Sequence, residues 1–265
     1  MENLKARLRN TWIAGDFGEI AKTFEIGSRE FVDRLGITKG QSVLDVACGT
    51  GNTAIPVARA GAAVTGIDIA PNLIEQAIVR NDAEGLAAEF DVGDAESMPY
   101  EDSSFDIVLT MFGAMFAPRP DVTADELKRV CRPGGLITMA NWTPEGFIGQ
   151  MFKNTGKYVP PPAGMPSPLL WGTYDAVSDR FENGISGLAT TKRTLFFTLP
   201  FGPAETVEYF RLYYGPTQKA FDALDFEGQR ALRHDLEALW SDNNQALDGT
   251  TKVESEYLEV RAIRA

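Results

Sequence analysis

The stretch VLDVACGTGN, residues 43–52, decides the fold of this chain. It begins with an apolar run that is typical of a buried strand and is interrupted by one acid, Asp45. Gly49, Gly51 and Ala54 follow with the spacing G-x-G-x-x-A, and glycines there allow a tight turn and the close approach of a ligand to the backbone. The stretch predicts a strand, a ligand-binding loop and a helix, and several cofactors are compatible with it.

Strand and helix patterns alternate beyond this loop. A second apolar run covers residues 62–70, and strand-like runs follow over 87–94, 105–112 and 136–142. Helical spacing separates them over 53–60, 71–84 and 121–131. This alternation predicts an α/β fold: a Rossmann-like, doubly wound sheet of about seven strands, mostly parallel, with the last strand antiparallel.

The chain divides into segments of different pattern. Residues 1–40 have helical spacing and are expected to form a lid, and residues 41–143 are expected to form the cofactor-binding core. Residues 144–190 hold a Pro-rich connection and a helix. Residues 191–200 and 253–265 alternate like two late core strands, and the helical residues 201–252 between them predict a cap on the substrate side.

Composition limits the classes of function. The formal net charge of −12, without a basic stripe, argues against nucleic acid as a partner. We expect no membrane span, and the start of the chain lacks a signal-peptide pattern, which favours the cytoplasm. Two cysteines and the lone His234 predict neither a metal site nor a disulfide framework. Small-molecule chemistry remains, with a homodimer as one open candidate for the oligomeric state.

Acids stand inside or at the ends of the first three predicted strands. Ligands of such a sheet bind outside the carboxyl ends of its strands. Asp68 could accept two hydrogen bonds from a ribose diol, or it could cap the helix that begins at Pro71. Asp94 could accept a hydrogen bond from an adenine amino group, or it could be a plain loop residue. Asp45 would be buried in its strand, so it needs a cationic or N–H-rich partner.

Four motifs carry a resemblance to a known family. In order and spacing, VLDVACGTGNTA, VTGIDIA, GDAESMPYEDSSFDIVLTMF and LKRVCRPGGLITM resemble the class I S-adenosylmethionine-dependent methyltransferases, and most of all their quinone-methylating, UbiE/COQ5-like branch (methyltransferase type 11). The resemblance covers about residues 40–142, and Ala47 departs from it where many members have glycine. It implies these cofactor-binding residues: Asp45, Ala47, Gly49 and Gly51 around the methionine half, Asp68 at the ribose, Ile69 on the adenine, Asp94 and Ala95 at the adenine edge, and Met111 and Phe112 beside the sulfonium.

The methyl acceptor is expected near the ends of the fourth and fifth strands, under the lid and the cap. Aromatic and methionine side chains there suit a flat, apolar acceptor, although they serve core packing equally well. The candidate lining residues are Trp12, Met115, Phe116, Asn141, Trp142 and Arg211. Tyr213, Tyr214 and Trp142 are candidates for a catalytic role, since a tyrosine could orient or deprotonate a hydroxyl, but the sequence contains no convincing general base.

The leading hypothesis is an S-adenosylmethionine-dependent methyltransferase that acts on a small molecule by in-line displacement. Positioning of the two reactants would supply much of the acceleration, so a strong base is not required. An NAD(P)-dependent oxidoreductase is the first alternative: G-x-G-x-x-A and Asp68 fit it, but Asp45 stays unexplained. A non-catalytic protein that binds S-adenosylmethionine is the second.

Overall fold

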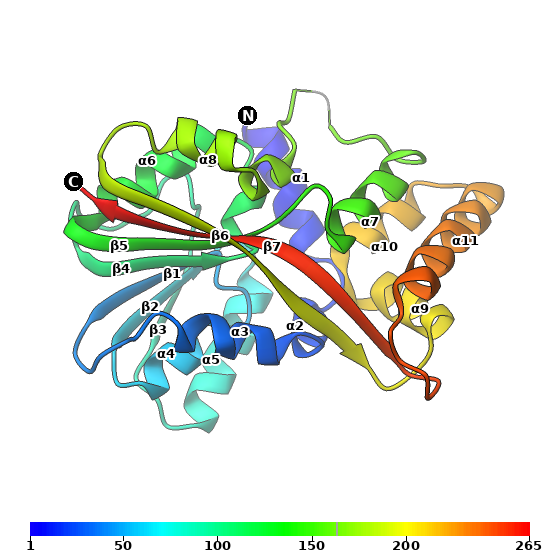
Figure 1. The fold of residues 1–265 in the computed structure, drawn as a ribbon, viewed down its shortest axis with the longest axis horizontal. Coiled ribbons are helices and arrows are strands. Elements are labelled where there is room, and N and C mark those ends of the chain that lie inside the picture. Colours follow the sequence, from blue (N-terminus) through cyan, green and yellow to red (C-terminus); the bar gives the residue numbers. More distant parts are fainter. Residues whose placement is uncertain (163) are drawn as a thin grey trace.

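The computed structural model describes residues 1–162 and 164–265, which are built around one twisted sheet (Figure 1). The strand order is β3-β2-β1-β4-β5-β7-β6. β7 runs antiparallel to both of its neighbours, and the other paired strands are parallel. The predicted fold class is therefore confirmed. The strands are β1 (Ser42–Val46), β2 (Ala63–Asp68), β3 (Glu89–Val92), β4 (Phe105–Met111), β5 (Cys131–Trp142), β6 (Ile185–Leu199) and β7 (Thr251–Arg264).

Helices cover both faces of the sheet (Figure 1). One face carries α3 (Glu25–Asp33), α4 (Ala54–Arg59) and α5 (Pro71–Ala83), and the other carries α6 (Pro120–Val130) and α8 (Tyr174–Arg180). The central strands are apolar on both sides because both faces are covered: Val43 and Leu44 of β1 are fully buried although they point in opposite directions. The apolar run of the opening motif thus forms the centre of the core.

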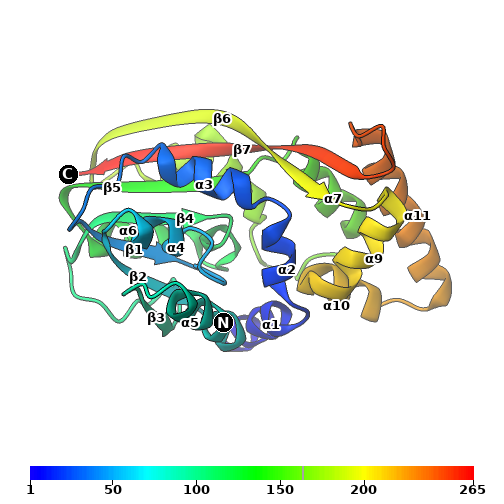
Figure 2. The same cartoon turned by 90° about the horizontal axis from the view of Figure 1, so that it is seen from below.

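The first forty residues form three helices. α1 (Glu2–Ile13) and α2 (Phe17–Lys22) precede α3, and the carboxylate of Asp16 accepts a hydrogen bond from the N–H of Gly18 at the start of α2. α1 lies at the carboxyl-end side of the parallel strands and contacts both α5 and α10 (Figure 2). This position is compatible with the predicted lid.

β6 and β7 extend beyond the parallel strands and reach a group of helices (Figure 1). α9 (Pro203–Tyr213), α10 (Gly215–Asp222) and α11 (Phe226–Asn243) connect these strands, and α7 (Phe147–Gly156) packs against α11. The ring of Trp240 lies 4.5 Å from that of Phe147 and 5.0 Å from that of Phe210, centroid to centroid. β6 begins six residues before the expected strand at 191, and β7 two residues before the one at 253.

Two short 3-10 helices complete the elements: η1 (Ala114–Phe116) follows β4, and η2 (Pro168–Gly172) precedes α8. Within residues 1–162 and 164–265, no helix has both the length and the apolar character needed to cross a membrane.

Candidate functional site

A cavity lies outside the carboxyl ends of β1, β2 and β4, and α1 forms one of its walls. It encloses about 1260 Å³ of space free of atoms, part of it open to solvent. Most of the residues predicted to bind a cofactor line it: Ala47, Gly49, Asp68, Ile69, Asp94, Ala95, Met111 and Phe112. Four of the predicted acceptor or catalytic residues also line it: Trp12, Phe116, Trp142 and Tyr214.

The loop after β1 is shaped by left-handed backbone. Gly49 and Gly51 have φ of 54° and 79°, which glycine adopts freely, but Ala47 also has φ of 56°. Such a conformation costs a residue with a Cβ roughly 1–2 kcal/mol. The backbone of Gly113, after β4, packs directly on Ala47, because a Cβ at position 113 would lie 2.4 Å from the Ala47 carbonyl oxygen. The two loops therefore meet backbone to backbone at the floor of the cavity.

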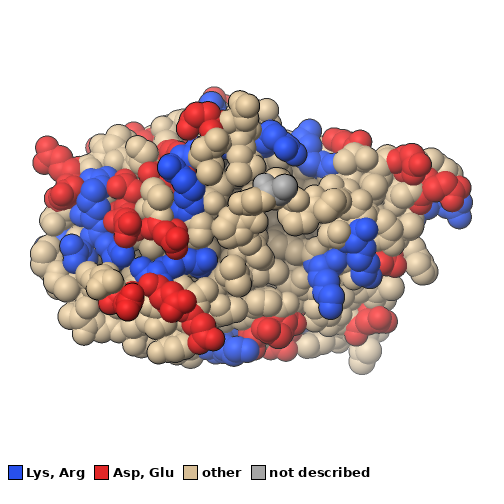
Figure 3. Space-filling model, turned by 90° about the horizontal axis from the view of Figure 1, so that it is seen from above, with Lys and Arg blue, Asp and Glu red and all other residues tan. Residues whose placement is uncertain are grey.

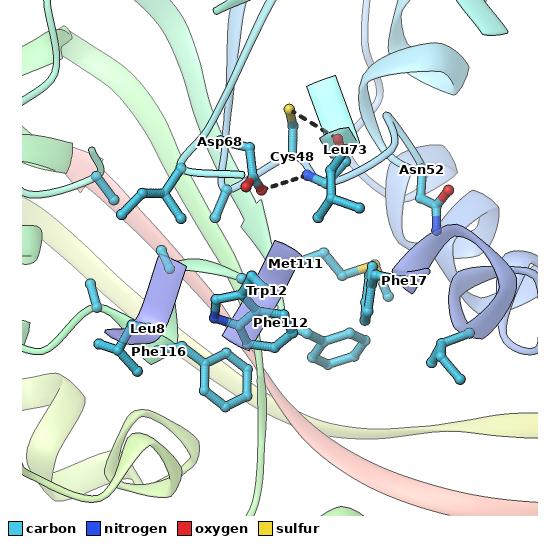
Figure 4. A pocket seen from close by; sticks show the side chains of 18 of the residues that line it. Leu8, Trp12, Phe17, Cys48, Asn52, Asp68, Leu73, Met111, Phe112 and Phe116 are labelled. Carbon is cyan, nitrogen blue, oxygen red and sulfur yellow. Dashed lines mark hydrogen bonds between the residues drawn. The ribbon is translucent and has the colours of Figure 1, made fainter. Parts of the chain in front are cut away.

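Asp68 ends β2 with its carboxylate buried at the wall of the cavity. Its Oδ2 accepts the N–H of Gly49 at 2.8 Å (Figure 4), and its Oδ1 accepts the N–H of Ala70 at 2.9 Å. Each oxygen still has a free lone pair for a ligand. Burial raises the pKa of Asp68, while the backbone N–H groups act in the opposite direction. The carboxylate thus ties the glycine loop to β2 and holds the backbone of Ala70, whereas the N-cap position of α5 is Ala70 itself and not Asp68.

Asp45 is fully buried beneath the same loop. Its Oδ2 accepts the hydroxyl of Thr53 at 2.5 Å, whereas its Oδ1 has no hydrogen-bond partner among the described residues. Burial raises the pKa of Asp45 to about 7. Asp45 does not line the cavity itself, but its partner Thr53 does. The partner expected from the sequence was cationic or rich in N–H groups, and within the described chain it is a hydroxyl instead, which leaves one oxygen without a donor.

Asp94 and Ala95 line the cavity at the end of β3. The Asp94 Oδ1 accepts the N–H of Glu96 at 2.9 Å, and its Oδ2 lies 2.5 Å from the ammonium of Lys5 on α1. Lys5 also lies 2.7 Å from Oε2 of Glu96. The carboxylate predicted to read an adenine edge is thus held from the N-terminal helix.

Aromatic side chains form the opposite wall of the cavity. Figure 4 shows the rings of Trp12, Phe112 and Phe116 across from Asp68, with Met111 between the two sides. Phe112 has φ of 61° and its ring stacks on Trp142, with centroids 3.5 Å apart and planes 7° from parallel. A bulky residue with a left-handed backbone is an outlier, so the surrounding structure imposes this conformation.

Two hydroxyls in the aromatic part of the cavity have no protein partner among the described residues. The Tyr214 side chain packs against Trp12, Phe17 and Phe210, and no hydrogen bond to its hydroxyl is formed. Burial alone raises the pKa of Tyr214. The Oγ of Ser28, on α3, is fully buried and also without a partner. The Tyr214 hydroxyl is therefore free to bond a ligand, and the Ser28 Oγ is a buried hydroxyl without a partner in the described chain, behind the cavity surface.

Six predicted residues do not line the cavity. Asp45 lies beneath the loop, and Gly51 packs against Ile55, Ala77 and Phe90. Met115 and Asn141 are buried elsewhere, and Asn141 precedes Trp142 on β5, so its side chain points to the other face of the sheet. Arg211 lies over the ring of Phe221 and pairs with Glu208, and Tyr213 packs on Tyr209.

Other lining residues escaped the sequence analysis. Lys5, Ser28, Thr53, Phe197 and Phe210 all face the cavity. For Lys5 a signal existed, because residues 5, 8 and 12 share one face of a helix and the other two are apolar. For Phe197 and Phe210, nothing in the neighbouring sequence distinguishes a cavity-lining phenylalanine from one that packs in the core.

The charged residues on the surface are mixed in sign. On the face shown in Figure 3, Lys and Arg side chains are interspersed with Asp and Glu, and mainly uncharged residues surround a hollow near the middle. The formal net charge of −12 is thus not gathered into a field of one sign on this face.

Comparison with known proteins identifies the family. The family model described as "Methyltransferase domain" matches residues 43–135, which span the glycine loop, Asp68 and Asp94. The chain belongs to the class I S-adenosylmethionine-dependent methyltransferases. The resemblance stated from the four motifs is therefore confirmed, and the chain is a methyltransferase.

Individual relatives of this methyltransferase extend the match. An uncharacterized protein of Mycobacterium tuberculosis is 42% identical over 82% of this chain and 80% of its own length. A demethylmenaquinone methyltransferase of Tropheryma whipplei is 35% identical over 48% of this chain and 53% of its own. A solved structure of a putative methyltransferase from Bacillus halodurans covers 89% of this chain and 97% of its own, with a TM-score of 0.59 at 19% identity, and supports the fold.

Proposed function

We propose that this methyltransferase binds S-adenosylmethionine along the carboxylate-bearing side of the cavity and methylates a flat, largely apolar small molecule seated among the aromatic rings. The observation that carries the proposal is that one side of the cavity carries carboxylates and the other side carries aromatic side chains. Asp68 and Asp94 line one side, and Trp12, Phe116 and Tyr214 line the other. A cofactor with an adenosine and an amino-acid part needs the first side, and an apolar acceptor needs the second.

The residues present fit the cofactor. Free lone pairs on Asp68 suit a ribose diol, and Asp94 with Ala95 suits an adenine edge. The Oδ1 of Asp45, buried and without a donor, places negative charge beneath the loop where the cationic end of the cofactor would lie. The left-handed loop from Ala47 to Gly51 keeps side chains away from that position.

The role of the protein in the reaction is positioning. S-adenosylmethionine, when bound, supplies a methyl group already activated on a sulfonium. The rings of Trp12 and Phe116, whose centroids lie 5.0 Å apart, exclude water from the aromatic side and orient a flat acceptor. Tyr214 stays protonated because burial raises its pKa, so it acts through a hydrogen bond and not as a base.

Binding and turnover test this function separately. We expect titration calorimetry to detect binding of S-adenosylmethionine and S-adenosylhomocysteine, with NAD giving no heat. We then expect a panel of uncharged phenols and hydroquinones to yield S-adenosylhomocysteine, whereas charged amines of similar size do not. No binding of either sulfur ligand at millimolar concentration would overturn the proposal. Binding without transfer to any acceptor would favour the non-catalytic alternative.

A further inference from the structure

Lys5 is the one residue of α1 that is buried, at 9% exposure. Its ammonium lies 2.5 Å from Oδ2 of Asp94 and 2.7 Å from Oε2 of Glu96. Hydrogen bonds to both carboxylates raise the pKa of Lys5 against the opposing effect of burial, so the ammonium is charged at neutral pH. A lysine is rarely buried unless it is paired, and here both partners belong to the segment after β3.

The segment that Lys5 holds is itself anchored. The side chain of Glu96 is fully buried and accepts the N–H of Arg119 at 2.5 Å and its Nε at 2.7 Å. The N–H of Glu96 in turn donates to Asp94. Two adjacent carboxylates repel each other, and Lys5 lies between them with Arg119 behind Glu96. Lys5 therefore attaches α1 to a fixed point of the cavity wall rather than to a mobile surface group.

α1 covers the length of the cavity from this point. Lys5, Leu8 and Trp12 lie on one face of the helix and all three line the cavity. Lys5 meets Asp94 at one end, and the Trp12 ring lies 5.9 Å from Phe17 and 6.1 Å from Tyr214 at the other. One helix thus contacts both the carboxylate side and the aromatic side.

We propose that Lys5 is a positioning residue that latches α1 over the cavity through Asp94 and Glu96, and so couples cofactor binding to closure of the acceptor side. The proposal rests on the proposed function. The Asp94 carboxylate has lone pairs for Lys5 and for a ligand amino group together, so a bound cofactor and the latch fix the same side chain. Cofactor binding then strengthens the contact between Lys5 and Asp94, and that contact in turn strengthens cofactor binding.

Lys5→Met tests the latch, because methionine keeps an unbranched apolar stem and removes the charge. Arg7→Met is the matched control: it removes a cation from an exposed position of the same helix that forms no ion pair among the described residues. We expect Lys5→Met to weaken S-adenosylhomocysteine binding at least tenfold, mainly through faster dissociation, and to speed hydrogen exchange of the amides of α1. Arg7→Met should stay within twofold of wild type, and Lys5→Arg should restore most of the loss.

The outcomes separate the latch from the proposed function. If wild type fails to bind S-adenosylhomocysteine, the proposed function fails. The latch is then tested on the free proteins, by comparing hydrogen exchange of the α1 amides in wild type and in Lys5→Met. Equal exchange and equal affinity in wild type and Lys5→Met would overturn it. Glu96→Gln provides a second variant, since glutamine keeps one of the two oxygen acceptors for Arg119 and removes one of the two negative charges that face Lys5. We expect Glu96→Gln to lose less S-adenosylhomocysteine affinity than Lys5→Met. An affinity equal to that of wild type would also count against the latch.

Discussion

The hydroxyl of Thr53 donates to Oδ2 of Asp45 at 2.5 Å, while Oδ1 of the same buried carboxylate has no partner among the described residues. Thr53 lines the cavity and Asp45 does not, so the acid of the opening motif lies beneath the loop, one hydroxyl away from the cavity. Ionisation of Asp45 therefore destabilises the folded protein, because a buried charge without full hydrogen-bond compensation costs free energy.

The Asp45 carboxylate predicts a pH-dependent stability. Burial raises its pKa from 3.8 to about 7 in the folded protein, so its contribution to stability is complete below about pH 4 and is lost as the pH rises through about 7. Asp45→Asn removes this titration. We expect the variant to gain stability relative to wild type by at least about 1 kcal/mol between pH 5 and pH 8, measured by urea unfolding at both values. A difference between the two proteins that is the same at both pH values would contradict this.

Asp68→Ala should weaken S-adenosylhomocysteine binding by more than about 1.5 kcal/mol, the scale of hydrogen bonds to a charged group. The same carboxylate holds the N–H of Gly49, so the substitution also loosens the glycine loop. Asp91→Ala is the matched control, since Asp91 is an exposed carboxylate on the neighbouring strand that, within residues 1–162 and 164–265, accepts only the Tyr100 hydroxyl. Titration calorimetry compares the three proteins, and an unchanged affinity of Asp68→Ala would show that the ribose contact is misassigned.

The carboxylate-bearing side of the cavity was predictable because its residues are local to strand ends. A parallel sheet brings the ends of consecutive strands together, so the loops that hold Gly49, Asp68 and Asp94 had to converge once the strands were recognised. The same logic could not predict Lys5, because its contact with Asp94 joins residues 89 positions apart through the packing of α1.

On the acceptor side, neighbouring residues in the sequence diverge in space. Asn141 and Trp142 were both expected to line the cavity, but alternation along β5 sends only Trp142 there. α9 ends at Tyr213, and its neighbour Tyr214 turns into the cavity while Tyr213 packs on Tyr209. The residue at which a helix ends is not readable from the sequence to within one position, so the two tyrosines could not be separated in advance.

The contact between the loops after β1 and β4 predicts opposite effects of two substitutions. Ala47→Gly should stabilise the protein by up to about 1 kcal/mol, because glycine adopts φ of 56° without strain, partly offset by its more flexible unfolded chain. Gly113→Ala should destabilise it by about 2 kcal/mol or more, since its methyl would lie 2.4 Å from the Ala47 carbonyl oxygen.

Urea unfolding measures both effects. Gly187→Ala on β6 is the control, because its Cβ would meet only Ile263 at 4.0 Å and its backbone is not left-handed. We expect this control to remain within about 0.5 kcal/mol of wild type. If Gly113→Ala were as stable as the control, the two loops would be further apart than described.

Tyr214→Phe isolates the hydroxyl that faces the acceptor side. The substitution keeps the ring contacts with Trp12 and Phe210 and removes only the oxygen, which bonds to no other described residue. We expect kcat/KM for an active acceptor to fall about tenfold, the value of one hydrogen bond in a desolvated site, while S-adenosylhomocysteine affinity stays within twofold. Tyr213→Phe should change neither quantity, because that side chain lies outside the cavity. Since Tyr214 stays protonated, the pH–rate profile of the variant should keep the shape of the wild-type profile. If the wild-type rate rose with pH and the variant lost that rise, Tyr214 would instead be assigned as a base.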